Sequence, residues 1–336
     1  MILDIWKKIN KKQFGSIYLL YGTEQFLINQ TKDLIVEQAL EEDEKDFNLS
    51  IIDLEEVPVE VALEDAETLP FIGERRVVIL KNPYFLTAEK GKDKVDHNIA
   101  KFEKYINEPA PYSIIVIMAP YEKLDERKKI SKLLKRQAEV LEANPLNEKD
   151  LTQWVMERAR TFDVTFQGGP IQELIQLTGT NLMIITQEVD KICLYVGKGG
   201  VVTEEDIHIL VPRSLEQNIF TLIEKIVQRK LSEALRIFYD LIQNNEEPIK
   251  ILSLLATQFR LIYQVKELAR RGYGQPQIAG NLKVHPYRVK LAAGQARLFS
   301  DAELSSIINQ LAEMDYEIKN GKIDKKLSLE LFIMKL

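Results

Sequence analysis

The sequence predicts an α/β domain built on a parallel sheet, followed by a small helical unit and a larger all-helical block. Up to Pro145, short apolar stretches alternate with segments of helical periodicity, which is typical of parallel strands joined by helices. After Pro145 no further strand is expected, and helical periodicity continues to the last residue. The 336 residues exceed what one core usually holds together, so two or three domains are expected.

The strands of the α/β part are predicted where β-branched and other apolar residues form short runs that end in turn residues. These runs lie at 17–21, 49–54, 76–80, 113–118 and 139–141. Helical spacing of apolar residues predicts helices at 24–40, 59–67, 95–106 and 127–136. A long, solvated loop is expected at 84–94, where the charge changes from acidic to basic.

The helical part is divided by its prolines and glycines. Four helices are predicted first, with Asn147 capping the first and Thr203 the last, at 148–162, 171–177, 181–195 and 204–210. Seven more follow at 219–228, 231–244, 248–271, 276–281, 286–298, 301–320 and 326–335. With breaks near Pro145 and Pro212, the predicted domains are 1–145, 146–212 and 213–336.

Composition narrows the function classes. Cys193 is the only cysteine, which excludes an internal disulfide and a cysteine-based metal site and fits a reducing cytosol. The three histidines lie far apart without ligand spacing, so no metal is expected, and no cofactor either. A net charge of −6 argues against coating nucleic acid by bulk electrostatics. No apolar run approaches the ~20 residues that span a bilayer, and no secretory signal is recognisable, so a cytoplasmic location without membrane contact is expected.

Four apolar residues in a row precede the third predicted strand: Leu69, Pro70, Phe71 and Ile72. Connections normally run over the surface, so such a run needs a reason. One interpretation is that these residues cap the core at the end of the sheet, and the other is that they form a plug for the pocket of a partner. Pro70 stiffens the segment and Gly73 lets the chain turn before the strand, which suits a displayed tip.

An α/β domain with a small helical domain behind it resembles the AAA+ ATPases, but the phosphate loop of those enzymes is missing. Their first strand runs into G-x-x-x-x-G-K-[ST], whose backbone N–H groups and lysine hold phosphate. The matching segment 21–27 reads YGTEQFL, with one glycine, no lysine, and Glu24 where phosphate would sit. Thr23 is the predicted N-cap, and Glu24 complements the helix dipole.

The residues that would hold Mg²⁺ and sense phosphate are also missing. The third strand leads into Lys81-Asn82 rather than into two acids, and segment 179–182 has no arginine. Asp53 is interpreted as a strand-end surface residue. We therefore expect no catalytic residues, no metal site and no ATPase activity.

Six segments in order along the whole chain resemble one family, the delta subunits of bacterial DNA polymerase III clamp loaders, in particular those of Gram-positive type. They are LYGTEQFL at 20–27, LPFIGERR at 69–76, KLDERKK at 123–129, EVDKI at 188–192, HPYRV at 285–289 and DYEIKNG at 315–321. The resemblance implies a degenerate AAA+ module, made of a sheet domain and a helical lid, followed by a C-terminal helical collar.

The resemblance also implies a function in chromosomal replication without chemistry of its own. Such a subunit grips the ring-shaped sliding clamp (beta) and opens it for loading onto primed DNA, in an assembly with the ATPase subunits (gamma/tau) and delta-prime. It is a cytoplasmic protein of the nucleoid and replisome. As a subunit of the polymerase III holoenzyme, it can be classed with the DNA-directed DNA polymerases although it has no activity of its own. The implied grip is Phe71 and Ile72 with Leu69 and Pro70. Arg75 near this tip either meets acidic clamp surface or is a solvated arginine at the start of the strand. Other members have Leu-Phe where this chain has Phe-Ile.

The predicted helix at 127–136 is strongly basic, and its spacing places Lys128, Lys132 and either Lys135 or Arg136 on one side. In clamp loaders, helices that line the central chamber follow duplex phosphates, so these residues are candidates for facing DNA. The alternative is a solvated basic helix.

Three other functions fit the sequence less well. Segment 276–298 scans as a helix-turn-helix of a DNA-binding regulator, but its second helix is apolar where base-reading residues belong. A delta-prime-like subunit would carry a zinc module and a Ser-Arg-Cys arginine finger, which the single Cys193 excludes. A working ATPase lacks its lysine and its acids.

Overall fold

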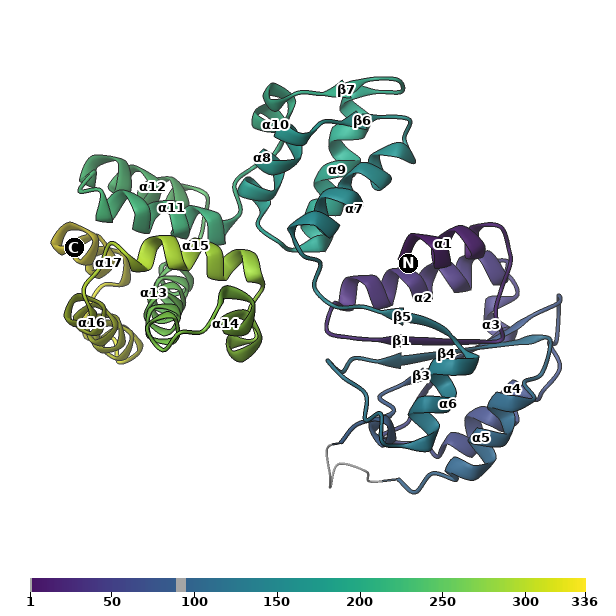
Figure 1. Cartoon of the computed structure of the whole chain (residues 1–336). Coiled ribbons are helices and arrows are strands. Elements are labelled where there is room, and N and C mark those ends of the chain that lie inside the picture. Colours follow the sequence, from purple (N-terminus) through teal and green to yellow (C-terminus); the bar gives the residue numbers. More distant parts are fainter. Residues whose placement is uncertain (1, 89–94) are drawn as a thin grey trace. The chain divides into compact units, whose positions relative to one another are not determined.

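The structure is a computed structural model that describes residues 2–88 and 95–336 (Figure 1). Its internal contacts divide the chain into two compact units, Met1–Pro145 and Leu146–Leu336, and each unit is described by itself. The division into three domains stays a prediction.

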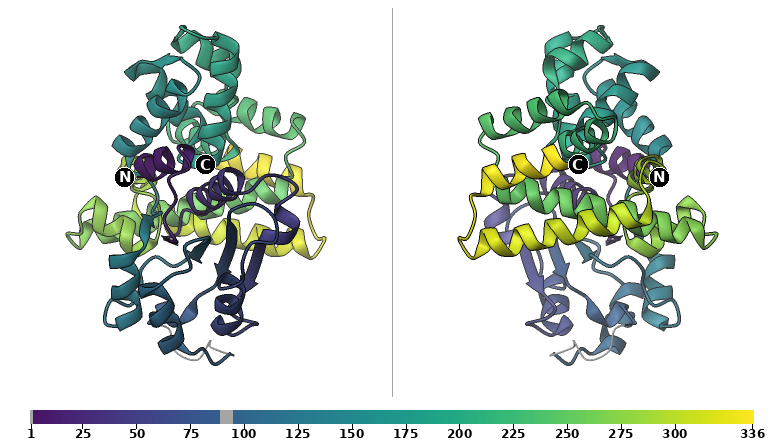
Figure 2. Two further views of the ribbon diagram at one scale, coloured as in Figure 1. Left: turned by 90° about the vertical axis from the view of Figure 1, so that its right-hand side faces the viewer. Right: turned by 90° about the vertical axis from the view of Figure 1, so that its left-hand side faces the viewer.

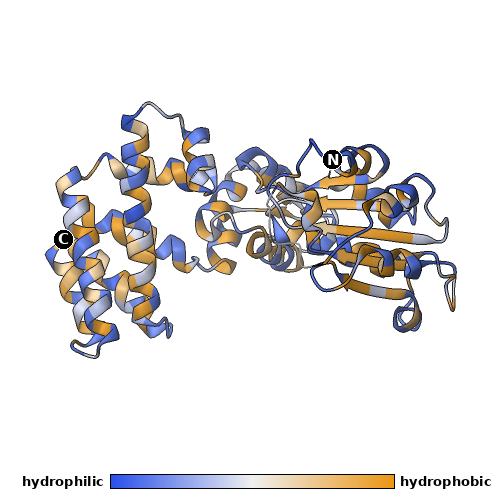
Figure 3. Ribbon diagram, turned by 90° about the horizontal axis from the view of Figure 1, so that it is seen from below, coloured by the Kyte–Doolittle hydropathy of each residue, from blue (hydrophilic) through white to orange (hydrophobic). Residues whose placement is uncertain are grey.

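The first unit is built on a five-stranded, all-parallel sheet of order β2-β3-β4-β1-β5. Its strands are β1 Ile17–Tyr21, β2 Leu49–Asp53, β3 Arg76–Lys81, β4 Ser113–Ala119 and β5 Glu139–Glu142. The three central strands β3, β4 and β1 are buried almost throughout, because helices cover both faces of the sheet. This is why their sequences are continuous apolar runs without alternation (Figure 3).

The helices of this unit lie on the two faces of the sheet, α1 and α2 on one and α4, α5 and α6 on the other (Figure 1). Their bounds are α1 Ile2–Asn10, α2 Gln25–Ala39, α3 Lys45–Asn48, α4 Val59–Ala66, α5 Ile99–Asn107 and α6 Lys129–Gln137, with a 3₁₀ turn at Tyr84–Leu86. The core on the second face joins Leu63 of α4, Phe102 of α5 and Leu134 of α6 to the strands.

Several details of this unit differ from the sequence prediction, among them the short helix α3, which was not expected. Helix α1 was not expected, and the indole N–H of its Trp6 donates to the Thr31 hydroxyl of α2 at 2.8 Å. Residues 84–88 of the predicted solvated loop include Phe85 and Leu86, which are buried in the core, whereas 89–94 lie outside the described residues. Helix α6 begins at Lys129 rather than 127, because the Asp125 carboxylate binds both the amide and the guanidinium of Arg127 in a turn before it.

The second unit begins with helices α7 Glu148–Arg160, α8 Gly168–Thr178, α9 Leu182–Val196 and α10 Glu204–Leu210. The expectation that strands end at Pro145 is wrong, because β6 Thr165–Phe166 and β7 Val201–Val202 form a short parallel pair. With two residues each, these strands are too short to produce a periodic pattern. Arg158 of α7 and Asp190 of α9 form a two-bonded ion pair at 2.6 and 2.7 Å that joins the two helices.

Seven further helices complete the second unit, at α11 Leu215–Val227, α12 Leu231–Gln243, α13 Pro248–Arg270, α14 Gln275–Leu282, α15 Pro286–Ala296, α16 Asp301–Lys319 and α17 Lys325–Lys335. The long helices α13 and α16 run side by side (Figure 2). Val289 and Ala292 of α15 are fully buried in the same core as Phe259 of α13. Helix α15 therefore turns its apolar face inward, as packing requires, and this face is not available to read DNA bases.

Candidate partner-binding site

The segment between α4 and β3 carries three large apolar side chains on the surface. The exposed fractions are 67% for Leu69, 73% for Phe71 and 44% for Ile72. The interpretation of these residues as a core cap is therefore wrong. We call residues Leu69, Pro70, Phe71 and Ile72 the tip; its role as a plug stays a prediction.

The end of α4 is fixed just before the tip begins. The Tyr112 hydroxyl donates to the Glu67 carbonyl at 2.7 Å, and the buried Ser113 hydroxyl donates to the Ala66 carbonyl at 2.6 Å. Both side chains stand at the start of β4, so the last turn of α4 is tied to the sheet. The tip therefore projects from a fixed base.

A buried asparagine holds the backbone of the tip. Asn48, the last residue of α3, is fully buried, and its side-chain oxygen accepts the Phe71 amide at 2.9 Å. Its side-chain nitrogen donates to the Ile72 carbonyl. One side chain thus binds the backbone of the tip through a donor and an acceptor, and this contact was not predicted. The only sequence signal is a polar residue before an apolar strand, which is common.

Gly73 ends the tip in a conformation that other residues rarely adopt, with φ +75°. A Cβ there would lie 1.8 Å from Oε1 of Glu44. The positive φ favours glycine at this point, in agreement with the sequence prediction that the chain changes direction there, whereas the Glu44 carboxylate could move away from a larger side chain.

Arg76, the first residue of β3, links the helices on either side of the tip. Its guanidinium is buried and donates to the Asp65 carboxylate of α4 at 2.6 Å and to the Phe47 carbonyl of α3 at 3.3 Å. Helices α3 and α4 are thereby held to the first residue of β3.

An aromatic side chain outside the predicted set belongs to the same surface. The rings of Phe47 and Phe71 stack with centroids 5.1 Å apart and an interplanar angle of 30°, and Phe47 is 51% exposed. Arg75 is half-buried, with its guanidinium 5.5 Å from the centre of the Phe14 ring. Arg75 is therefore engaged with the chain itself on one face of its guanidinium.

The four basic candidates fall into two pairs; Lys128 precedes α6, and the other three lie within it. Lys128 donates to the Phe85 carbonyl at 2.9 Å, and Lys135 pairs with Glu126 at 2.6 Å and lies over the Tyr21 ring. The hydrogen bond to Glu126 raises the pKa of Lys135. Lys132 and Arg136 are exposed and make no ion pair with any part of the chain that the structure describes. These two line a hollow of about 310 Å³ together with Lys135 and Glu126.

The loop after β1 is used internally. The N-cap of α2 is Glu24 rather than the predicted Thr23, and its carboxylate accepts the Phe26 amide at 3.2 Å. The Glu24 amide donates to the Ala143 carbonyl at 2.8 Å, so the loop is held against the end of β5. Gly22 has φ +135°, and a Cβ added there would lie only 2.1 Å from that carbonyl oxygen. The backbone here faces the chain, not a phosphate.

Asp53 lies at the end of β2, as predicted, and its carboxylate accepts the Asn82 amide at 2.9 and 3.1 Å and the Glu55 amide at 3.0 Å. Among residues 2–88 and 95–336, no group of three or more His, Cys, Asp or Glu is placed to hold a metal ion. None of the described helices is both long enough and apolar enough to cross a bilayer.

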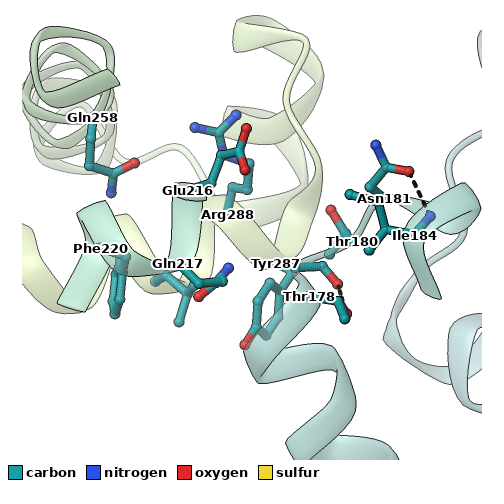
Figure 4. A pocket seen from close by; sticks show the side chains of 12 residues that line it. Thr178, Thr180, Asn181, Ile184, Glu216, Gln217, Phe220, Gln258, Tyr287 and Arg288 are labelled. Atoms are coloured by element: carbon teal, nitrogen blue, oxygen red, sulfur yellow. Dashed lines mark hydrogen bonds between the residues drawn. The ribbon is translucent and has the colours of Figure 1, made fainter. Parts of the chain in front are cut away.

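A cavity of about 260 Å³ lies in the second unit between the ends of α8, α9, α11 and α15 (Figure 4). Its charged lining residues are Glu216 and Arg288, beside neutral amides such as Gln217 and Gln258. Burial raises the pKa of Tyr287, which also lines it.

Comparison with known proteins gives two matches to one family. Residues 18–144 match the family described as "DNA polymerase III, delta subunit", and residues 216–336 match its "C-terminal domain".

Individual relatives agree with this match. The chain is 53% identical to the DNA polymerase III subunit delta of Bacillus subtilis over 336 residues, which is all of this chain and 97% of the relative. It is 24% identical over 260 residues to the probable DNA polymerase III subunit delta of Aquifex aeolicus. This match covers 76% of this chain and 72% of the relative. The solved structure of the Bacillus subtilis DNA clamp loader delta protein matches with a TM-score of 0.90, covering all of this chain and 99% of that one. This likeness confirms the predicted fold class.

Proposed function

The chain belongs to the DNA polymerase III delta subunit family, and from this membership we propose that it grips a sliding clamp by its tip and opens the ring. The observation that carries the proposal is the exposure of Leu69, Phe71 and Ile72 on a backbone that the chain itself holds in place. Two or three such side chains entering a pocket each contribute about 1.5–3 kcal/mol, which is enough to anchor a modest interface. The subunit does no chemistry in this role.

The test uses the full chain and the sliding clamp of the same organism. The wild-type chain should form a complex with the clamp in gel filtration. The double variant Phe71→Ala/Ile72→Ala should bind at least about tenfold more weakly, which corresponds to ~1.4 kcal/mol. Its melting temperature should fall by a few degrees at most, because Phe71 is 73% and Ile72 44% exposed.

Ile51→Ala is the matched control, because Ile51 is an exposed aliphatic residue of the edge strand β2 and lies outside the tip. It should bind the clamp like the wild type. A double variant that binds normally would remove the tip from the proposed function.

We further propose that the helical collar, residues 213–336, joins the ATPase subunits (gamma/tau) and delta-prime in one clamp loader. Helix α17 supports this with three exposed apolar side chains at helical spacing, Leu327, Leu331 and Met334. Such a face is typical of a surface that another chain covers. The sheet domain 1–145 and the lid 146–212 complete the three-domain division.

Contact with primed DNA in the assembled loader is proposed for α6. The structural support is restricted to Lys132 and Arg136, because Lys128 and Lys135 already bind groups of the chain. A location in the cytoplasm at the replisome follows from this set of partners.

A further inference from the structure

The short helix α3 and the residue before it contact the tip and the glycine that follows it. Asn48 binds its backbone, Phe47 stacks on Phe71, and Glu44, which precedes α3, closes around Gly73. Resting on the proposed function, we propose that α3 is the second half of the clamp-binding element, with Phe47 as a contact residue and Asn48 as a positioning residue.

The case for Phe47 begins with its surroundings. The Phe47 ring is half exposed to solvent, and its stacking partner Phe71 is the most exposed side chain of the tip. A pocket that receives Phe71 must also meet the ring beside it, since the two centroids are only 5.1 Å apart. The apolar surface that a clamp would cover therefore extends from Ile72 over Phe71 onto Phe47.

The stack also limits the freedom of Phe71 before binding. An exposed phenylalanine samples several rotamers, and fixing them on binding reduces affinity. Phe47 lies against one face of the Phe71 ring and leaves the other face for a pocket. The occupant that suits this surface is a preformed apolar pocket on a folded protein, which is what the proposed clamp contact requires.

Asn48 also limits the conformational freedom of the tip, by holding its backbone. Its two hydrogen bonds flank the peptide between Phe71 and Ile72, the pair with the proposed anchoring side chains. Because Asn48 is fully buried while the residues it binds are exposed, the hydrogen bonds orient the tip from inside the protein. Asn48 itself has no surface to offer a partner.

The experiment measures clamp affinity for the full chain with Phe47→Ala, Asn48→Ala, the tip double variant Phe71→Ala/Ile72→Ala, and Ile51→Ala as control. Phe47→Ala should weaken binding about fivefold, because an aromatic ring is lost from the contact surface. The melting temperature should fall by a few degrees at most, because the lost stack with Phe71 contributes only about 0.5–1.5 kcal/mol to the fold. Asn48→Ala should weaken it by a similar factor and speed hydrogen exchange of the Phe71 amide, whose acceptor is gone.

Each substitution is then repeated in the background of the tip double variant. If α3 acts through the tip, Asn48→Ala should have no further effect there, whereas general damage to the fold would lower affinity in both backgrounds. If Asn48→Ala melts early, Phe47→Ala decides alone, because its exposed ring can be removed without opening the core.

Two results would overturn the proposal, and they differ from each other. Phe47→Ala and Asn48→Ala binding like the wild type, while the tip double variant binds weakly, would remove α3 and leave the tip as the binding element. A tip double variant that binds normally would remove the proposed function and the role of α3 with it.

Discussion

The two loops of the first unit that invite a functional interpretation use their atoms in opposite ways. In the loop after β1, the Glu24 amide and carboxylate are bound within the chain, to Ala143 and to Phe26. In the tip, the backbone at Phe71 and Ile72 is bound by Asn48, and the side chains stand in solvent. A loop suits an apolar partner when its backbone is satisfied internally and its apolar side chains are left exposed.

The strongest test of this comparison is a pair of glycine substitutions. Gly22→Ala places a methyl group 2.1 Å from a backbone oxygen of Ala143, which cannot move without the sheet edge, so we expect a loss of more than about 3 kcal/mol in unfolding free energy. Gly73→Ala meets only the carboxylate end of Glu44, which can rotate away, and we expect about 1–2 kcal/mol from the positive φ. Chemical denaturation measures both values.

Gly73→Ala should also weaken clamp binding, because the turn that presents the tip is altered, whereas Gly22→Ala should affect binding only through unfolding. Equal losses of stability in the two variants would show that the loop after β1 is no more tightly packed than the end of the tip.

The same distinction between bound and free groups gives a smaller effect on α6. In the assembled loader, Lys132→Ala/Arg136→Ala should weaken DNA binding and reduce the slope of log affinity against log salt by about two, one for each lost phosphate contact. Lys128→Ala/Lys135→Ala is the matched pair of equal charge. It should change the slope less and stability more, because Lys128 and Lys135 bind Phe85 and Glu126. Identical slopes for the two pairs would contradict the assignment.

The smallest expected effect is none. A fluorescent ATP analogue titrated into the full chain should give no binding, since the Glu24 carboxylate would repel phosphate at the start of α2 and the Asp53 carboxylate is bound by Asn82. Adding Mg²⁺ should make no difference. Saturable binding at micromolar concentration would show that the loop after β1 can still open to a ligand.

Much of the fold could be predicted because each of its signals is local. Continuous apolar runs gave β1, β3 and β4, since a strand buried on both faces leaves no polar position. Helical periodicity gave the long helices of the second unit. Local patterns failed where an element is very short, as in β6 and β7, and where a segment that seemed polar contains buried anchors, as at Phe85 and Leu86.

The sequence by itself determined the parallel sheet, the helical remainder, the missing phosphate loop and the run of apolar residues at 69–72, because composition and spacing carry all of these. Tertiary structure alone decided that this run lies on the surface, that Asn48 and Phe47 support it from 23 and 24 residues away, and which of the basic residues of α6 are free. The physical reason is that exposure and hydrogen bonding depend on which segments meet in space. No local pattern specifies that meeting.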